Sequence, residues 1–246
     1  MFKDTNNFSL FKMKNSITHR IVYKSKVLRD FLGGCIWITQ MLFLKFYKDP
    51  KIVDLINSVK KERDILMTPL DAFSLCSIVK MQSNLEGEMA EVGVYRGGSS
   101  KLICELKSDR KLHLFDTFEG LPQTSESDTI SKNIYWKTAQ FSGTSLESVK
   151  KYLEKYDNIF FYKGKFPDTA EHVKNSTFSF VHLDVDLYQS TLDCLQFFYP
   201  RLIKGGIILS HDYNADSVRK AFEDYFMKNK QQIFEIGGIQ GMVIKN

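Results

Sequence analysis

The stretch that most constrains the fold is residues 88–122, EMAEVGVYRGGSSKLICELKSDRKLHLFDTFEGLP. Residues 89–94 alternate apolar side chains as a buried strand does. The turn RGGS follows, and Ser99 or Ser100 is expected to cap a helix whose apolar residues recur at helical spacing. A second short strand then ends at an acid, Asp116. The order of strand, glycine turn, helix and strand predicts part of a doubly wound α/β sheet.

The same stretch indicates a ligand site. In such a sheet the ligand lies over the carboxyl end of the first strand, and an acid about 20 residues further on accepts hydrogen bonds from ribose hydroxyls. The spacing Glu91-x-Gly93-x-x-x-Gly97-Gly98 is not the GxGxxG pattern that binds a pyrophosphate, which disfavours a nicotinamide-dependent oxidoreductase. Acids at Glu91 and Asp116 suit a cationic nucleoside without a pyrophosphate, and S-adenosylmethionine is the obvious candidate. Taken alone, the glycines fit the turns of another α/β protein equally well.

Four further polar residues, Asp184, Asp186, His211 and Asp212, come at the ends of two later predicted strands. Adjacent parallel strands end on the same edge of a sheet, so these side chains are expected to converge beside the ligand. A carboxylate that follows the largely apolar run 178–183 has no role in a core unless it is paired. The plainer alternative is that Asp184 caps a loop amide or pairs with a lysine.

Five blocks occur in order between about residue 62 and the C-terminus: EVGVYRGGSS, LFDTFEGLP, KGKFPDT, HLDVDLYQST and GGIILSHDY. They resemble the macrocin O-methyltransferase family, whose members methylate sugar hydroxyls on tylosin- and mycinamicin-type macrolides and related glycosylated products. The resemblance covers about three quarters of the chain and none of roughly the first 50 residues. It implies a class I methyltransferase that depends on S-adenosylmethionine.

The predicted fold is therefore α/β, with a Rossmann-like, seven-stranded, mostly parallel sheet and helices on both faces. Residues 61–246 are expected to form this domain, and residues 1–60 a helical extension that is partly disordered. Thr144 and Asn214 are expected to cap the helices that follow them. Residues 123–143 are polar but contain aromatic side chains, which favours a binding loop or lid. The remaining strands are expected at residues 159–162, 178–184 and 206–211, with a closing pair at 232–236 and 241–244.

The strand ends and the resemblance together assign residues to the cofactor. The predicted S-adenosylmethionine site comprises Glu91, Gly93, Tyr95, Arg96, Gly97, Ser99, Asp116, Thr117, Phe118 and Asp184.

The resemblance also implies a metal. The family binds Mg²⁺ through the first Asp of its LDxD block and an Asp-Asp pair after the fifth strand. Asp184 and Asp212 match this pattern, whereas His211 stands where the first Asp of the pair is expected. Mg²⁺ prefers oxygen ligands, while imidazole suits Mn²⁺, Zn²⁺ and other transition metals better. We predict a divalent metal, Mg²⁺ or Mn²⁺, at these three residues. Weaker Mg²⁺ binding, or a metal-free site with His211 as a base, stays open.

The expected reaction is an in-line displacement on the sulfonium methyl of the cofactor. Sugar hydroxyls are poorly acidic, so a metal or a well-placed base is required. Asp184 and His211 are the predicted catalytic residues and His182 is a third candidate for the base, whereas His113 is expected to be structural. The expected acceptor is a sugar or a glycosylated small molecule. A catechol-like or other small acceptor, and a non-catalytic protein that retains the fold, are the alternatives.

The charge distribution and the cysteine content limit the expected partners and compartment. The first 30 residues hold seven of the 34 basic and two of the 29 acidic residues, which leaves 27 of each sign in the rest of the chain. That remainder lacks the basic bias of many nucleic-acid-binding domains, so no nucleic-acid partner is expected. The four cysteines, Cys35, Cys76, Cys104 and Cys194, show no CxxC or metal spacing, which indicates reduced thiols in a cytoplasmic protein.

Residues 21–47 form an apolar segment outside the resemblance. The fourteen residues 31–44 carry no charge, fewer than the 18 or more expected of a spanning helix, and no cleavage site indicates a signal peptide. One interpretation is a helix packed on the domain or on a partner subunit of a homo-oligomer. The other is an interfacial helix whose Lys24, Lys26 and Arg29 contact anionic lipid.

Overall fold

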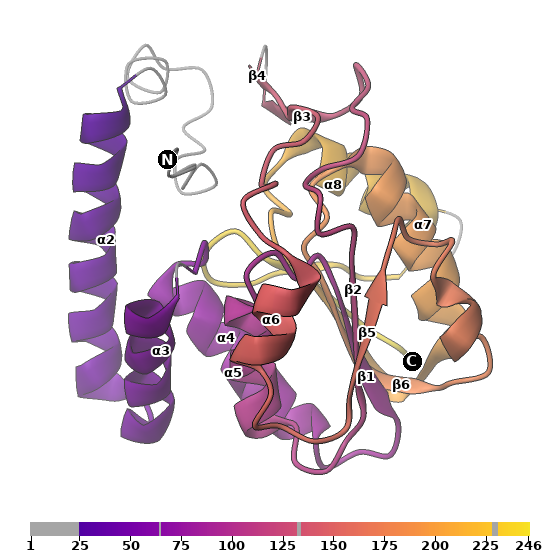
Figure 1. The fold of residues 1–246 in the computed structure, drawn as a ribbon, viewed down its shortest axis with the longest axis horizontal. Helices are drawn as coiled ribbons and strands as arrows, with labels where there is room; N and C mark the ends of the chain where they lie inside the picture. The colour runs from indigo at the N-terminus through magenta and orange to yellow at the C-terminus, as the bar shows by residue number, and fades with distance from the viewer. Residues whose placement is uncertain (1–24, 64, 132–133, 228–230) are drawn as a thin grey trace.

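The computed structural model describes residues 25–63, 65–131, 134–227 and 231–246. A seven-stranded sheet runs through it in the order β5-β2-β1-β6-β7-β9-β8 (Figure 1). The first five of these strands pair in parallel, and β9 is antiparallel to both β7 and β8. The predicted seven-stranded, mostly parallel sheet is therefore confirmed. Its strands are β1 (Glu88–Val92), β2 (Leu112–Asp116), β5 (Ile159–Lys163), β6 (Phe178–Leu183), β7 (Leu202–Ser210), β8 (Phe234–Glu235) and β9 (Gly241–Ile244).

Helices cover both faces of the sheet, and two hydrophobic clusters form the core between them and the strands (Figure 1). The first face carries α2 (Lys26–Tyr47), α3 (Pro50–Glu62), α4 (Pro69–Gln82), α5 (Gly98–Leu106) and α6 (Leu146–Tyr152). The second face carries α7 (Tyr188–Phe198), α8 (Asp216–Phe226) and the short 3-10 helices η1 (Ala170–Val173) and η2 (Tyr199–Arg201).

The central strand β1 is buried on both sides. Met89 packs in the cluster under α4 and α5, and Ala90 and Val92 pack in the cluster under α7 and α8. Glu91, between them, is fully buried as well. A strand covered on both faces places its carboxyl end deep in the molecule, which is where the predicted ligand site lies.

The turn after β1 differs from the sequence prediction. Neither Ser99 nor Ser100 caps α5, because the helix begins earlier, at Gly98, with Gly97 as its N-terminal cap at φ 79°. A glycine in the left-handed region lets the chain turn at once into the helix. The hydroxyl of Ser100 instead donates a hydrogen bond to the buried Glu91 carboxylate.

Two other predicted caps are also wrong. The cap of α6 is Ser145, whose hydroxyl oxygen accepts a hydrogen bond from the backbone N–H of Ser148, while the Thr144 hydroxyl donates to the Tyr95 carbonyl. The cap of α8 is Ala215 instead of Asn214. In each case a nearby residue has the extended backbone that a cap requires.

The long polar segment after β2 is partly ordered by a hairpin. The strands β3 (Thr129–Ser131) and β4 (Ile134–Tyr135) pair antiparallel within it, apart from the main sheet. From this segment Trp136 is buried and Tyr135 is exposed. The segment therefore turns one of its aromatic side chains inward and another outward.

The N-terminal prediction is tested in part. The mobility predicted for residues 1–20 lies outside the described residues. Residues 26–47 form a single helix, α2, and none of the described helices is long and apolar enough to cross a membrane. The division of the chain at residue 60 remains a prediction, although Ile52, Val53, Ile56 and Val59 of α3 join the core cluster beneath the first face.

The β1 turn generates a stability prediction. Gly93 has φ +90°, and an added Cβ atom would lie 1.9 Å from the Asp184 carbonyl oxygen. Gly93→Ala should therefore lower the free energy of unfolding by at least about 2 kcal/mol, through backbone strain and steric overlap. Denaturant unfolding followed by circular dichroism measures the loss.

The matched control is Gly34→Ala, because an added Cβ atom at this helical glycine of α2 meets nothing within 4 Å. This variant should gain up to about 1 kcal/mol from helix propensity. Equal stability of Gly93→Ala and the wild type would show that the β1 turn relaxes without cost.

Candidate active site

A cavity opens at the carboxyl ends of the parallel strands. Residues from the ends of β1, β2, β6 and β7 line it, and the segment 65–67 before α4 closes one side. Most of the predicted site residues are on its wall: Gly93, Tyr95, Arg96, Ser99, Asp116, Thr117, Asp184, His211 and Asp212. The common edge of parallel strands thus brings together residues that lie far apart in the sequence.

Three predicted cofactor residues, Glu91, Gly97 and Phe118, are not on the cavity wall. The carboxylate of Glu91 lies beneath it, fully buried, where it accepts a hydrogen bond from Ser100 and contacts the ring nitrogen Nδ1 of His182 at 2.9 Å. Strand alternation places Glu91 and His182 two residues before Gly93 and Asp184 on the same face, one layer deeper. His182 is consequently out of reach of an acceptor in the cavity.

Asp116 shapes the wall nearest α5. Its Oδ2 accepts hydrogen bonds from the backbone N–H groups of Val94 at 2.7 Å and Tyr95 at 2.8 Å, and its Oδ1 accepts one from Phe118 at 2.6 Å. A carboxylate has about four acceptor positions, so one remains for a ligand. Tyr95 and Phe118 have φ 51° and φ 54°, unusual values that these hydrogen bonds stabilise.

The segment between β4 and α6 is tied to this turn. The Thr144 hydroxyl donates to the Tyr95 carbonyl at 2.6 Å, and the Arg96 side chain donates to the Gly143 carbonyl at 3.1 Å. The Tyr95 and Phe141 rings meet edge to face with their centroids 5.7 Å apart. Phe141 and Trp136 line the cavity, so the predicted binding loop does contribute to its wall.

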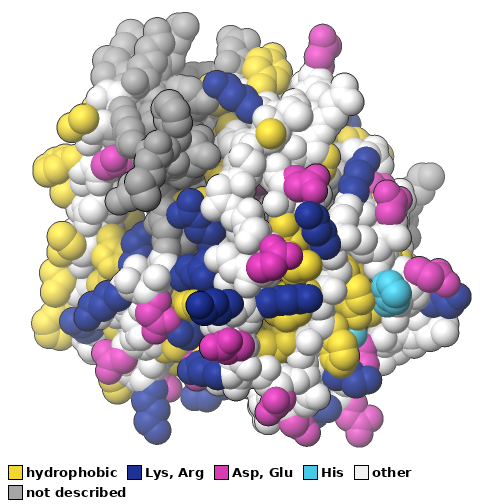
Figure 2. Space-filling model, viewed as in Figure 1, with side chains coloured by type: hydrophobic (Ala, Val, Ile, Leu, Met, Phe, Trp, Pro, Cys, Tyr) yellow, Lys and Arg dark blue, Asp and Glu magenta, His cyan; other side chains and the backbone are white. Residues whose placement is uncertain are grey.

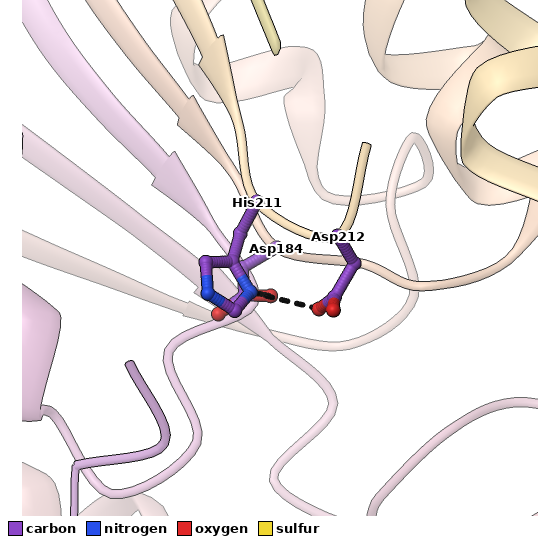
Figure 3. A group of neighbouring side chains, drawn as sticks. All are labelled: Asp184, His211 and Asp212. Carbon is purple, nitrogen blue, oxygen red and sulfur yellow. Dashed lines mark hydrogen bonds and ion pairs between the residues drawn. The ribbon is translucent and has the colours of Figure 1, made fainter. Parts of the chain in front are cut away.

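Asp184, His211 and Asp212 converge on the opposite part of the wall (Figure 3). Nδ1 of His211 lies 2.8 Å from Oδ2 of Asp212 and 3.3 Å from Oδ1 of Asp184. One potential ligand atom from each residue lies within 4.8 Å of the others. The alternative in which Asp184 pairs with a lysine is not observed among the described residues, because its partner is the imidazole.

The charges of this cluster are strongly coupled. Burial opposes the charged imidazolium, but the carboxylates of Asp212 and Asp184 outweigh it and raise the pKa of His211 well above its ordinary value. Burial also opposes ionisation of Asp184, but the imidazolium prevails and lowers the pKa of this carboxyl. A proton on Nδ1, between the two carboxylates, is therefore held more tightly than in a free imidazole.

Asp186 is a fourth member, present in the sequence pattern but without a role assigned from it. It is buried, lines the cavity and has φ 61°. Burial, followed by the charges of Asp212 and Asp184, raises the pKa of its carboxyl well above the ordinary value. The Asp186 carboxyl therefore holds its proton more tightly than an ordinary aspartic acid does.

The cavity wall also contains residues that were not predicted as site residues. Ser190, in the first turn of α7, belongs to the block HLDVDLYQST, and Lys165 and Phe166 belong to the block KGKFPDT. The Tyr188 hydroxyl, in contrast, pairs with Asp224. Residues 65–67 lie in a connection without a motif, and only the packing of that connection against the strand ends could reveal them.

The donor set fits a divalent cation. Two carboxylates and an imidazole nitrogen converge, and burial together with the negative charge concentrated there raises the pKa of the neighbouring Asp186 carboxyl. A dication in place of the imidazole proton would relieve that repulsion. Carboxylate oxygens suit Mg²⁺ and Mn²⁺ alike, and the imidazole nitrogen favours Mn²⁺.

Over residues 67–240 the chain matches the family model described as Macrocin-O-methyltransferase (TylF). The chain belongs to this family. The resemblance seen in the five sequence blocks is therefore confirmed.

Curated relatives agree with this membership. The chain is 31% identical over 169 residues to the 8-demethyl-8-(2,3-dimethoxy-alpha-L-rhamnosyl)-tetracenomycin-C 4'-O-methyltransferase of Streptomyces olivaceus, covering 63% of this chain and 64% of the relative. It is 27% identical over 172 residues to the Mycinamicin III 3''-O-methyltransferase of Micromonospora griseorubida, covering 65% and 68%. The match thus spans about two thirds of the length of these relatives.

Solved structures share the fold. The O-methyltransferase NovP superimposes with a TM-score of 0.61 at 21% identity, over 74% of this chain and 82% of that chain. An O-methyltransferase from Bacillus cereus, solved in complex with SAH, gives a TM-score of 0.53 at 14% identity, over 85% and 98%. The sheet and its helices are accordingly those of Rossmann-like O-methyltransferases.

The cluster charges predict how metal binding depends on pH. Nδ1 of His211 must lose its proton to coordinate, and the raised pKa keeps that proton bound through neutral pH. Mn²⁺ affinity should therefore rise with pH, by about tenfold per unit while the proton is bound. Calorimetric titration in buffers of different ionisation enthalpy measures the affinity and the protons released.

His211→Asp should replace the nitrogen ligand by oxygen, shift the preference from Mn²⁺ towards Mg²⁺ and make the pH dependence shallower. The control is His172→Asp, because His172 is an exposed imidazole away from the cavity and its replacement should leave both properties unchanged. Affinity that does not vary with pH in the wild type would remove His211 from the ligands.

Proposed function

We propose that the protein is an S-adenosylmethionine-dependent O-methyltransferase that methylates a hydroxyl of a sugar or of a glycosylated small molecule. The main support for this proposal is that one cavity contains both the residues expected to bind the cofactor and those expected to activate the hydroxyl. Asp116 and the β1 turn lie on one wall, and Asp184, His211 and Asp212 lie on the other. Family membership and the names of the relatives, which include sugar-specific O-methyltransferases, support it.

S-adenosylmethionine fits the first wall better than a dinucleotide does. Asp116 retains one acceptor position, which suits a ribose hydroxyl. The turn after β1 lacks GxGxxG, so it offers no pyrophosphate cradle. We therefore assign Gly93, Tyr95, Arg96, Ser99, Asp116 and Thr117 to the cofactor site. Glu91, Gly97 and Phe118 support that site from outside the cavity.

The donor supplies an electrophilic methyl group, so the protein has to position a hydroxyl and accept its proton. Nδ1 of His211 faces two carboxylates, which raise the pKa of the ring, so this nitrogen is disfavoured as the base. The imidazolium lowers the pKa of Asp184 and so weakens it as a base. The carboxyl of Asp186 has a raised pKa and holds its proton more tightly than an ordinary aspartic acid does. The protein groups nearest the expected hydroxyl are therefore not well suited to remove its proton unaided.

This charge state favours metal assistance. A divalent cation held by Asp184, His211 and Asp212 would lower the pKa of a hydroxyl bound beside it. Such a cation would take the place of the imidazole proton. The Asp186 carboxyl, which is not one of the three ligands, would then ionise more readily beside the dication and could accept the hydroxyl proton. His211 is accordingly proposed as a ligand and not as the base, while His182 is too deeply buried for either role.

The partners proposed are a glycosyl acceptor and, through the apolar segment 21–47, a second copy of the chain or a lipid surface. A cytoplasmic location remains a prediction from the cysteine pattern.

Calorimetric titration with S-adenosylhomocysteine, followed by assays on a panel of glycosides and catechols with Mg²⁺ or Mn²⁺, tests the proposal. Methylation of glycosides and not of catechols, abolished by a chelator, is the expected outcome. Cofactor binding with catechol methylation alone would favour the small-acceptor alternative. Absence of cofactor binding would favour a non-catalytic protein.

The variant Asp116→Asn tests whether Asp116 binds the cofactor. The amide oxygen can still accept from Val94 and Tyr95, but the NH₂ group replaces the oxygen that faces Phe118 and the ligand. Affinity for S-adenosylhomocysteine should fall by about 1–3 kcal/mol, the scale of a charge-assisted hydrogen bond.

Asp128→Asn is the control, because Asp128 is another buried carboxylate that accepts bonds from the backbone N–H groups of Ser125 and Tyr188 but does not line the cavity. The Asp128→Asn variant should be less stable than the wild type but should retain its affinity for S-adenosylhomocysteine. Equal affinity losses in both variants would make the effect of Asp116 structural.

A further inference from the structure

The helix α2 has one face docked and one face uncovered. On its inner side Met41 and Leu44 are buried in the core cluster, and Trp37 packs against it. The Gln40 side-chain oxygen accepts a hydrogen bond from the backbone N–H of Leu70, at the start of α4, at 3.1 Å. The helix is therefore a fixed part of the domain and presents its outer side in a defined orientation.

The outer side of α2 is strongly apolar. Seven of the twelve large hydrophobic side chains that are exposed in the described part of the chain belong to this one helix. Figure 2 shows hydrophobic side chains gathered along the edge of the molecule where α2 lies. The seven, with their exposed fractions, are Val27 (80%), Phe31 (66%), Ile38 (60%), Leu42 (52%), Phe43 (50%), Phe46 (80%) and Tyr47 (72%).

Five of these residues form a continuous stripe. Val27, Phe31, Ile38, Leu42 and Phe46 recur at spacings of four and seven, which places them on one side of a helix. The exposed Cys35 falls in the gap between Phe31 and Ile38. Such a stripe is the pattern with which one helix packs on another, and an exposed apolar patch of this kind marks an interaction site.

Asp30 and Lys45 bound the uncharged run 31–44 of the stripe and indicate which partner covers it, while Lys26, Arg29 and Lys48 lie outside that run. Asp30 and Lys45 are both exposed and have opposite signs, and no charged residue lies between them. In an antiparallel pair related by a twofold axis near Ile38, each Asp30 lies beside the Lys45 of the other copy. A parallel pair would instead bring like charges together. The stripe is thus complementary to itself in one orientation, as a twofold interface requires.

We propose that two copies of this chain pair through the outer faces of α2, antiparallel and with Ile38 at the twofold axis. The stripe of each copy is then covered by that of the other, and two Asp30–Lys45 pairs close its ends. The pairing also steadies α4, whose first turn is held by Gln40 and which follows the cavity-lining segment 65–67 directly. This proposal is independent of the reaction the protein catalyses.

Sedimentation of the full-length protein should show a dimer. Ile38→Glu would place two carboxylates opposite each other at the axis and should weaken the dimer by about a hundredfold or more. The matched control is Met81→Glu, because Met81 is 52% exposed on α4, outside the proposed interface, and this variant should remain dimeric. Unchanged circular dichroism and S-adenosylhomocysteine binding show that each variant is folded.

Charge exchange and cross-linking test the orientation. Asp30→Lys should weaken the dimer, and adding Lys45→Asp should restore it. In a Cys35→Ser background, Ile38→Cys should form a disulfide across the axis on mild oxidation. Phe46→Cys should not, because an antiparallel arrangement separates the two copies of residue 46 by about 24 Å along the helix.

Several results would overturn the proposal. A wild-type monomer at micromolar concentration contradicts it, and so does a dimer that survives Ile38→Glu. A monomer that floats with phosphatidylcholine–phosphatidylserine vesicles would identify lipid as the partner instead. A wild-type monomer that dimerises only when residues 1–24 are removed would show that this segment covers the stripe.

Discussion

The carboxylate of Asp116 holds the ligand-facing edge of the sheet in shape. It ends β2 and accepts hydrogen bonds from three backbone N–H groups, two in the turn after β1 and one in the chain after β2. Both segments pass through backbone conformations that non-glycine residues rarely adopt. The Asp116 carboxylate therefore stabilises the strained backbone at Tyr95 and Phe118, and Tyr95 forms part of the cavity wall. The same carboxylate retains an acceptor for a ligand, so shape and recognition depend on one side chain.

The opposite wall of the cavity is shaped by its concentration of acidic side chains. Asp184, Asp186, Asp212 and His211 are crowded at the ends of β6 and β7. Their three carboxyl groups and the imidazole ring are largely buried. Such a group of carboxylates is stable only if protons or cations offset their charge. The raised pKa values of His211 and Asp186 act in this direction, because both groups hold their protons more tightly. In the function proposed above, a divalent cation would take over this role and help to activate a poorly acidic hydroxyl.

Helix α2 connects the surface of the molecule to one wall of the cavity through its contact with α4. Its inner face is anchored at the first turn of α4, and the segment before α4 is part of the cavity wall. Burial of its outer face would therefore restrict motion close to the site without contributing a residue to it.

The sequence by itself determined the sheet and the convergence of Asp184, His211 and Asp212, because strand alternation and the shared edge of parallel strands are local and topological rules. It did not determine which predicted residues face the cavity. Glu91 and His182 point into the layer below, since a shift of two residues along a strand changes depth without changing face. Helix caps also differed: α5 begins after Gly97 in the left-handed conformation, and α6 and α8 begin after Ser145 and Ala215 in the extended conformation. Only the tertiary structure decided the charge of the cluster, because a pKa depends on the distance and burial of groups that are remote in sequence.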